Sequence, residues 1–303
     1  MLENPNIPYQ KVSNSLLERK HVQLIVKRLD LIHPLVSGNK FYKLKYNIEA
    51  AKRNGYRKLV TFGGAFSNHI HAAAEAAKLE GLKIVGIIRG EESLPLNPTL
   101  QRATDSGMEL HYISRTAYRD KTDPGFIDRL KDIYGDFYLI PEGGTNALAI
   151  KGTSEIIQGE DFSADIITCS IGTGGTMGGI VSAAKEDQKV WGFSSLKGDF
   201  IYEEFNNLLI KESIRPKCSY EIFSEYHFGG YGKHKAELLD FMHDFYRNTG
   251  IPLDPVYTGK MMYGIFNKLE EVEDHTTILC LHTGGLQGIA GFNRRFGTEL
   301  PER

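Results

Sequence analysis

The sequence predicts an α/β protein built from two open, doubly wound parallel sheets. Short β-rich apolar runs alternate along the chain with longer stretches of helical spacing, and several glycines stand between a helical stretch and the next strand. Strands joined by helices form parallel sheets that are covered on both faces. A length of 303 residues suits two smaller sheets better than one large sheet.

The expected strands follow one another through the whole chain. In order, they cover residues 21–29, 57–62, 82–90, 108–113, 136–140, 164–171, 189–195, 219–223 and 276–282. Strong helix formers predict a helix over HAAAEAAKLE, from His71. Gly55, Gly81 and Gly107 each lie between a helical stretch and a strand, which is typical of left-handed helix caps. The Gly- and Tyr-rich segment 227–235 is expected to be a long loop, and such loops often line sites.

The order of these elements also suggests where the chain divides. We place soft boundaries near Lys43 and Pro141, although no Pro/Gly/Ser-rich linker marks either of them. Residues 44–140 would then form a small α/β domain. Residues 1–43 and 141–303 would form a large domain.

Composition limits the classes of function that the chain can have. Its net charge is -2 and it has no basic stripe, which argues against nucleic acid as a partner. No apolar run approaches the roughly 18 residues of a membrane helix, and the first residues lack the pattern of a secretory signal. Cys169, Cys218 and Cys280 are too far apart for a disulfide framework or a C-x-x-C metal site. We therefore expect a cytoplasmic enzyme of small-molecule metabolism.

The strongest motif is SIGTGGTMGGI, residues 170–180. It follows an apolar strand and precedes a helical stretch, so its glycines lie at a helix N-terminus, where backbone N–H groups attract phosphate. A P-loop would require a lysine at its end, and a dinucleotide fold would require G-x-G-x-x-G followed by an acid about 20 residues later. Both features are absent, so the motif suits a phosphate that is anchored and not transferred, as in a pyridoxal phosphate (PLP) enzyme. A tight turn with glycines for packing is the alternative.

A PLP enzyme also needs a lysine that forms a Schiff base with the cofactor. Lys40 is the candidate, because the Gly38-Asn39 turn can fix the position of the next side chain. The simpler interpretation is a solvated lysine after a turn.

A third segment, TFGGAFSNHIHAAA, predicts a strand, a glycine turn and a helix that starts near Ser67, Asn68 and His69. Donors at a helix N-terminus suit a substrate carboxylate, although Ser and Asn are also ordinary helix caps. His69 and His71 are two positions apart and do not share a helix face, so we expect no metal site there.

Together these segments resemble the fold-type II PLP-dependent enzymes, which share the tryptophan synthase β-like fold. More closely, they resemble the branch that contains D-cysteine desulfhydrase and 1-aminocyclopropane-1-carboxylate (ACC) deaminase. The similar stretches occur in the family's order over almost the whole chain. They are KRLDL, SGNKFYKLKY, FGGAFSNH, PEGGTNALAIKG, IGTGGTMGG, DPVYTGKMM and LHTGG.

The resemblance implies roles for individual residues. Lys40 would hold PLP as a Schiff base and shuttle the Cα proton, and Asn68 would contact the pyridoxal 3′-oxygen. Ser67 and His69 would meet the substrate carboxylate, with Ser67 also near the transferred proton. The phosphate would be held by Thr173, Gly174, Gly175 and Thr176.

Two tyrosines would complete the active site by the same resemblance. Tyr257 would lie beside the cofactor and substrate, and Tyr231 would match a second active-site tyrosine. This second match is the looser one, because the chain between Trp191 and Tyr231 is shorter than in the family. Leu29, where the family often has a second aspartate, and the single glycine before Asn39 are further departures.

Two positions separate the two chemistries of this branch. Sequences that resemble ACC deaminases carry Glu directly after the tyrosine of D-P-V-Y, and Leu at the second position of H-x-G-G. This chain has Thr258 at the first of these positions and Thr283 at the other. A carboxylate beside the pyridine nitrogen strengthens the cofactor as an electron sink, whereas a threonine hydroxyl can only form a hydrogen bond. Expelling a thiolate needs a weaker sink than opening a cyclopropane ring. The threonines can also simply pack in their turns.

The prediction is α,β-elimination of D-cysteine to pyruvate, hydrogen sulfide and ammonia, with Tyr257 or Tyr231 as a possible proton donor to sulfur. ACC deaminase, which gives 2-oxobutyrate and ammonia, is one alternative, and elimination from another β-substituted amino acid is a second. A nucleotide-binding oxidoreductase and a non-catalytic PLP-binding protein belong to other classes. By resemblance, the chain is expected to form a homodimer.

Overall fold

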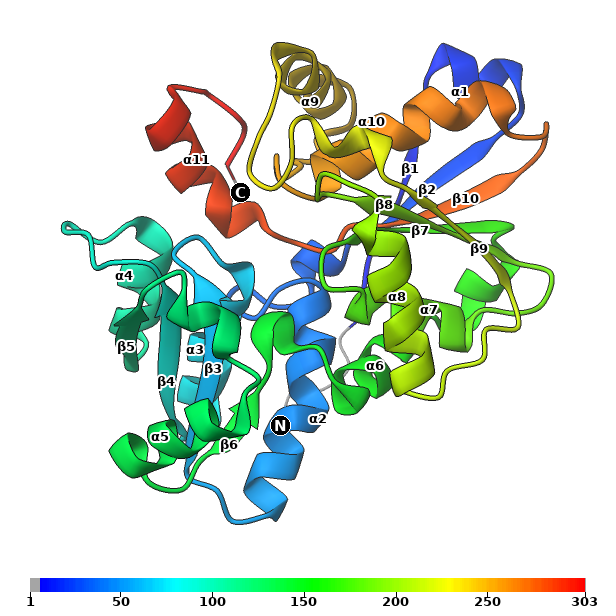
Figure 1. Ribbon diagram of the computed structural model, residues 1–303. Helices are drawn as coiled ribbons and strands as arrows, with labels where there is room; N and C mark the ends of the chain where they lie inside the picture. Colours follow the sequence, from blue (N-terminus) through cyan, green and yellow to red (C-terminus); the bar gives the residue numbers. More distant parts are fainter. Residues whose placement is uncertain (1–5, 303) are drawn as a thin grey trace.

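The computed structural model describes residues 6–302, and its strands form two separate sheets (Figure 1). The larger sheet has six strands in the order β1-β2-β10-β7-β8-β9, and the smaller has four in the order β5-β4-β3-β6. All neighbours are parallel except β1 and β2, which pair antiparallel. The predicted fold class, two parallel-sheet α/β units, is therefore confirmed.

The strands lie close to their predicted positions. They are β1 (Tyr9–Val12), β2 (Gln23–Lys27), β3 (Lys58–Gly64), β4 (Lys83–Arg89), β5 (Met108–Ile113), β6 (Tyr138–Ile140), β7 (Ile166–Ile171), β8 (Lys189–Ser194), β9 (Ser219–Phe223) and β10 (Thr277–Leu281). Only β1 was not predicted from the sequence. It is an edge strand of only four residues, YQKV, in which apolar and polar residues do not alternate, so the sequence lacks a clear strand pattern.

The helices connect the strands and cover both sheets. They are α1 (Ser15–Arg19), α2 (Asn39–Arg53), α3 (Asn68–Leu79), α4 (Pro98–Asp105), α5 (Pro124–Tyr134), α6 (Ala147–Ser154), α7 (Gly175–Ala183), α8 (Phe200–Lys211), α9 (Ala236–Thr249), α10 (Thr258–Lys268) and α11 (Ile289–Phe296). Gly55, Gly81 and Gly107 have φ values of 79°, 67° and 88°, as expected for left-handed caps. Within residues 6–302, none of the helices is both long enough and apolar enough to cross a membrane.

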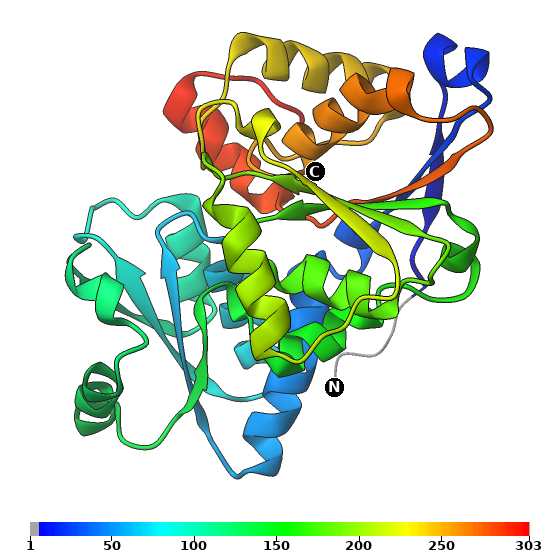
Figure 2. The same ribbon diagram turned by 45° about the vertical axis from the view of Figure 1, so that its right-hand side comes forward.

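Helix α2 runs between the two sheets, as Figures 1 and 2 show from two directions. The small sheet uses strands from residues 58–140, and the large sheet uses strands from both sides of this stretch. The boundary expected near residue 43 falls inside α2, so this helix packs on both units. The domain limits stay predictions, and residues 1–5 and 303 of the expected large domain lie outside the described residues.

The fold brings three strand ends toward α2. Strand β3 ends at Gly64 before α3, β7 ends at Ile171 before α7, and β10 ends at Leu281 before the turn of residues 282–285. Ligands bind in open α/β folds at the carboxyl ends of parallel strands. Two of the motifs singled out from the sequence, residues 61–74 and 170–180, lie at the ends of β3 and β7, and the third, around Lys40, opens α2.

Candidate active site

Lys40 lies in the first turn of α2, against the loop that follows β10. Gly38 precedes the helix with φ of 66°, and a Cβ at Gly38 would lie only 2.0 Å from the carbonyl oxygen of Thr283. The backbone N–H of Asn39 donates to the same oxygen at 3.3 Å. Glycine is therefore required at position 38, because this contact and this φ both exclude a side chain. The tight junction fixes where Lys40 enters the site.

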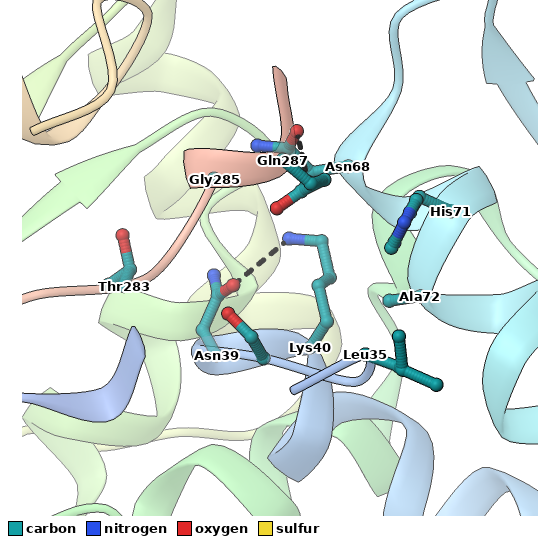
Figure 3. Close-up of a pocket in the computed structure, with 10 residues that line it drawn as sticks. Leu35, Asn39, Lys40, Asn68, His71, Ala72, Thr283, Gly285 and Gln287 are labelled. Carbon is teal, nitrogen blue, oxygen red and sulfur yellow. Dashed lines mark hydrogen bonds between the residues drawn. The ribbon is translucent and has the colours of Figure 1, made fainter. Parts of the chain in front are cut away.

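The side chain of Lys40 points into a small cavity that is lined by residues of both units (Figure 3). Its Nζ donates to Oδ1 of Asn39 at 3.2 Å. Burial lowers the pKa of Lys40 to about 8, although the carboxylate of Asp254 opposes the shift. Near neutral pH a useful fraction of this amine is uncharged, which a lysine needs to attack a carbonyl carbon. The cavity is lined by Leu35, Ser37, Asn39, Lys40, Asn68, His71, Ala72, Thr283, Gly285 and Gln287.

The glycine motif forms the turn between β7 and α7. Gly174 has φ of 75°, and α7 begins at Gly175. A Cβ at Gly175 would lie 2.8 Å from Oγ1 of Thr145 and 3.0 Å from Nζ of Lys43, so a side chain would fill the space above the helix N-terminus. The predicted phosphate loop thus has the expected backbone: a left-handed glycine, followed by the N–H groups of the first turn of a helix.

Hydroxyl groups surround this turn. Oγ1 of Thr173 is 2.6 Å from Oγ1 of Thr145, and Oγ1 of Thr176 accepts from Nδ2 of Asn39 at 2.7 Å. Asn39 therefore links the loop to the residue next to Lys40. Thr145 and Asn39 were not predicted from the sequence as site residues, although each lies in a stretch that carries the family resemblance.

Lys43 is the most informative residue that the sequence analysis missed. It is 2% exposed, and its Nζ donates to the Gly143 carbonyl at 3.1 Å, to Thr145 Oγ1 at 2.9 Å and to Thr173 Oγ1 at 3.3 Å. Among residues 6–302, all of its hydrogen-bond partners are neutral oxygens. Burial, and then the nearby charge of Lys40, hold the pKa of Lys43 well below its usual value.

A buried ammonium group without a counter-charge is costly, and an anion beside it would remove that cost. Lys43, the α7 N-terminus and the threonine hydroxyls together fit the phosphate of PLP, because they supply positive charge and neutral donors but no carboxylate. The signal in the sequence was the spacing of Lys40 and Lys43, which places both on one side of α2.

Ser67, Asn68 and His69 lie at the start of α3, as predicted. Ser67 is the helix cap, and its Oγ accepts from the backbone N–H groups of His69 and Ile70 at 3.2 and 3.3 Å. Its hydroxyl proton is not used in these two bonds. Oδ1 of Asn68 accepts from Nε2 of Gln287 at 2.7 Å. The helix cap interpretation of Ser67 is therefore correct, and it leaves a donor for a substrate carboxylate.

The side chain of His69 faces the small sheet and not the cavity around Lys40. Its Nε2 is 2.7 Å from Oγ1 of Thr61, and this hydroxyl donates its proton to the Ile140 carbonyl at 2.8 Å. His69 must then donate through Nε2, which leaves Nδ1 as a bare acceptor, and this atom is buried without a partner in the described chain. Burial, followed by the charges of Lys40 and Lys43, lowers the pKa of His69 well below its usual value. A substrate carboxylate would find no imidazole donor here.

Tyr231 and Tyr257 meet on the other side of the site. Their rings are 5.9 Å apart, and a Cβ at Gly172 would lie 3.5 Å from the Tyr257 hydroxyl. Burial raises the pKa of Tyr231, and burial followed by the interaction with Tyr231 raises the pKa of Tyr257 well above its usual value. Tyr231 is 46% exposed overall, so the buried part must be its hydroxyl end, which faces Tyr257. Both tyrosines stay protonated at neutral pH, so they can donate protons but not act as bases.

The two threonines that separate the two chemistries lie in different surroundings. Thr283 lines the cavity of Lys40. Thr258 is fully buried, and its hydroxyl donates to Oδ1 of Asp254 at 2.9 Å and accepts from the Asp254 N–H at 2.8 Å. The proton of Thr258 is thus committed to Asp254. A bond from this hydroxyl to a ring nitrogen stays a prediction, and the geometry favours the packing alternative at this position.

Asp254 is a buried carboxylate whose hydrogen bonds are complete. Its Oδ1 accepts from the N–H and hydroxyl of Thr258, and its Oδ2 accepts from the N–H groups of Val256 and Tyr257 at 2.9 and 3.0 Å. Four bonds fill the acceptor positions of a carboxylate. Asp254 therefore stabilises the start of α10 and has no oxygen lone pair left for a ligand.

The whole chain has known relatives. A family model described as "pyridoxal-phosphate dependent enzyme" matches residues 4–284. A putative 1-aminocyclopropane-1-carboxylate deaminase of Pyrococcus horikoshii is 30% identical over 87% of this chain and 84% of its own. A bifunctional D-cysteine desulfhydrase/1-aminocyclopropane-1-carboxylate deaminase of Arabidopsis thaliana, named as mitochondrial, is 29% identical over 88% of this chain and 73% of its own.

Solved structures agree on the fold. An ACC deaminase homologue superimposes with a TM-score of 0.80 and 28% identity, covering 95% of this chain and 92% of the other. The O-acetylserine-dependent cystathionine β-synthase of Helicobacter pylori has a TM-score of 0.69, with 98% of this chain and 96% of its own covered, and at 14% identity supports the fold alone. These findings replace the alternative of a nucleotide-binding oxidoreductase. The chain belongs to the pyridoxal-phosphate-dependent enzymes of fold type II, and pyridoxal phosphate is its cofactor.

Proposed function

We propose that this enzyme is a carbon–sulfur lyase that converts D-cysteine and water to pyruvate, hydrogen sulfide and ammonia. The observation that carries the proposal is the absence of a carboxylate among the residues that line the Lys40 cavity in the described chain. Thr283 is the polar residue of the H-x-G-G segment there, and the nearby carboxylate of Asp254 is saturated by α10. A cofactor without a carboxylate partner is a modest electron sink, which suits a substrate with a good leaving group.

PLP, when bound, withdraws electrons from the Cα of an amino acid that is joined to it. The residues of this chain would bind the cofactor and the substrate and would transfer the protons. Lys40 would hold the cofactor and then move the Cα proton, a role that suits an amine with a pKa of about 8. Lys43, Thr173, Thr176 and the N–H groups of Gly174 and Gly175 would anchor the phosphate.

The substrate would be oriented by the start of α3 and by the two tyrosines. The hydroxyl of Ser67 keeps its proton and can donate to the substrate carboxylate, and the helix dipole adds to the attraction. Tyr257 or Tyr231 would donate a proton to the departing sulfur, and the raised pKa values mean that both hydroxyl groups carry their protons at neutral pH. A homodimer and a cytoplasmic location, expected from the resemblance and from the cysteines, belong to the same proposal.

ACC deaminase is the second candidate, because several relatives carry that name. Release of 2-oxoacid from D-cysteine, L-cysteine and ACC by the PLP-saturated protein separates the two functions. Pyruvate from D-cysteine with no product from ACC is the expected result. If ACC gives 2-oxobutyrate and D-cysteine gives nothing, the deaminase function replaces our proposal. Lys40→Ala should abolish either activity.

A pair of substitutions tests whether the two threonine positions decide the substrate. Thr258→Glu with Thr283→Leu should move activity toward ACC if they do. Thr258→Glu also removes a hydroxyl that Asp254 uses, so Thr258→Val serves as the control for this loss. If the double variant is folded and keeps the parent's preference for D-cysteine, the substrate is decided elsewhere.

A further inference from the structure

Gln287 lines the Lys40 cavity, and its side chain hydrogen-bonds to Asn68. It lies in the 3₁₀ turn η7 (Leu286–Gly288), after the H-x-G-G segment, and its Nε2 donates to Oδ1 of Asn68 at 2.7 Å. Both side chains lie beside the Nζ of Lys40 in Figure 3, and both line its cavity. Neither the family resemblance nor the sequence motifs gave Gln287 a role.

The hydrogen bond decides which end of the Asn68 amide faces the cavity. An asparagine amide has an accepting oxygen on one side and a donating NH₂ group on the other. Because its oxygen accepts from Gln287, its NH₂ group must point the other way. A Cβ placed on Gly285 would lie 3.0 Å from Nδ2 of Asn68 and 3.1 Å from Oδ1 of Asp254, so the NH₂ group lies on the side of a buried carboxylate. The negative charge of Asp254 favours this orientation over the reverse one.

The chemistry of PLP places an oxygen where this donor is available. The aldehyde carbon that bonds to the active-site lysine is attached to a pyridine ring carbon whose neighbour in the ring carries the 3′-oxygen. A cofactor joined to Lys40 therefore has its 3′-oxygen near Nζ, in the cavity that Asn68 lines. A donor there stabilises the oxygen as an anion, whereas the amide oxygen would repel it.

We propose that Gln287 is a positioning residue that holds the Asn68 amide with its NH₂ group toward the 3′-oxygen of the cofactor, and so lowers the pH at which the bound chromophore titrates. This inference rests on the proposed role of Lys40 as the residue that holds PLP. It adds a residue that tunes the cofactor through the Asn68 amide.

The test compares Gln287→Met with Gln287→Glu in the PLP-loaded protein. Met keeps the length of the side chain but cannot donate, and Gln287 also lines a second, adjacent cavity, with Leu286 and Ala290, that gives it room. We expect the pH midpoint of the visible absorption band to rise by about 0.7 unit and PLP affinity to fall about fivefold, the size of one ordinary hydrogen bond. Above pH 8, Gln287→Glu should have a larger effect, because its carboxylate accepts and turns the amide oxygen toward the cofactor.

Gln101→Met is the matched control, because Gln101 also donates from Nε2, but to the exposed Asp105. It should leave both the midpoint and the affinity unchanged. If Gln287→Met lowers the melting temperature but keeps the parent's midpoint and PLP affinity, the residue is only structural and the inference is wrong. If the parent shows no visible band with PLP, or Lys40→Ala keeps the parent's band, the proposed role of Lys40 has failed instead.

Discussion

Lys27 and Lys43 are both buried lysines, but they have different surroundings. Lys27, on β2, is 0% exposed and forms an ion pair with Asp161, which also accepts from the Tyr9 hydroxyl at 2.8 Å. Lys43, on α2, has only neutral oxygens around its Nζ in the described chain. A buried charge that has its own counter-ion is explained by the fold. A buried charge without one indicates a ligand, and here it lies beside the glycine loop of α7.

The largest effect should come from breaking the pair at Lys27. Lys27→Met leaves the Asp161 carboxylate buried without its cation, and we expect the free energy of unfolding to fall by about 3–5 kcal/mol. Urea unfolding of the cofactor-free protein measures this loss. Lys27→Met with Asp161→Leu should recover most of it, since no buried charge is left. A single variant as stable as the parent would show that the pair is not structural.

Lys43→Met, in contrast, should not lower the free energy of unfolding substantially. It removes a buried amine that has no counter-ion and whose pKa is lowered, and Met replaces most of the lysine stem. We expect the cofactor-free protein to stay within about 1 kcal/mol of the parent, or to become more stable. The same urea experiment compares the two lysines directly. A loss of about 3 kcal/mol or more would mean that Lys43 holds the fold together, as Lys27 does.

A smaller effect is expected in the pH dependence of the free energy of unfolding, to which Lys40 contributes. Its pKa is about 8 in the folded protein and 10.5 in an ordinary environment, so between these values the unfolded chain binds more protons. Stability therefore rises with pH across this range, and we expect about 1 kcal/mol between pH 7.5 and 9 for the cofactor-free protein. Lys40→Met should lack this part of the rise. Equal slopes in the two proteins would contradict the lowered pKa.

The smallest expected effect is a change in kcat at Lys260, a third buried lysine. Its Nζ donates to the carbonyls of His227 and Gly230, both 2.8 Å away, and so holds the loop that carries Tyr231. Lys260→Met should lower kcat several-fold with little change in PLP affinity, because Tyr231 loses its position beside Tyr257. Lys233→Met, in the same loop, serves as the control. A parallel loss of PLP affinity would place Lys260 in the cofactor site instead.

The sequence predicted the layout of the fold because its signals are local. Apolar strands, helical stretches and the cap glycines at 55, 81 and 107 each depend on neighbouring residues, and nine of the strands in the described chain were expected. The glycine turn before α7 and the start of α3 were found for the same reason.

What could not be predicted depends on contacts between distant segments. Lys43 has the pattern of a solvated helix residue, and only the approach of Gly143 and Thr173 shows that it is enclosed. Gln287 contacts Asn68 across 219 positions of the chain. The commitment of the Thr258 hydroxyl to Asp254 depends on turn geometry that a family motif does not specify.

The most direct test of the account is the affinity of the cofactor-free protein for PLP and for pyridoxal, which lacks the phosphate. The parent should bind PLP much more tightly than pyridoxal. Lys43→Met should reduce this preference by about 10- to 100-fold, the worth of a charged hydrogen bond, while Lys27→Met, measured where it is folded, should keep it. If Lys43→Met retains the parent's preference for PLP, the unpaired lysine does not bind the phosphate, and the assignment of the site is wrong.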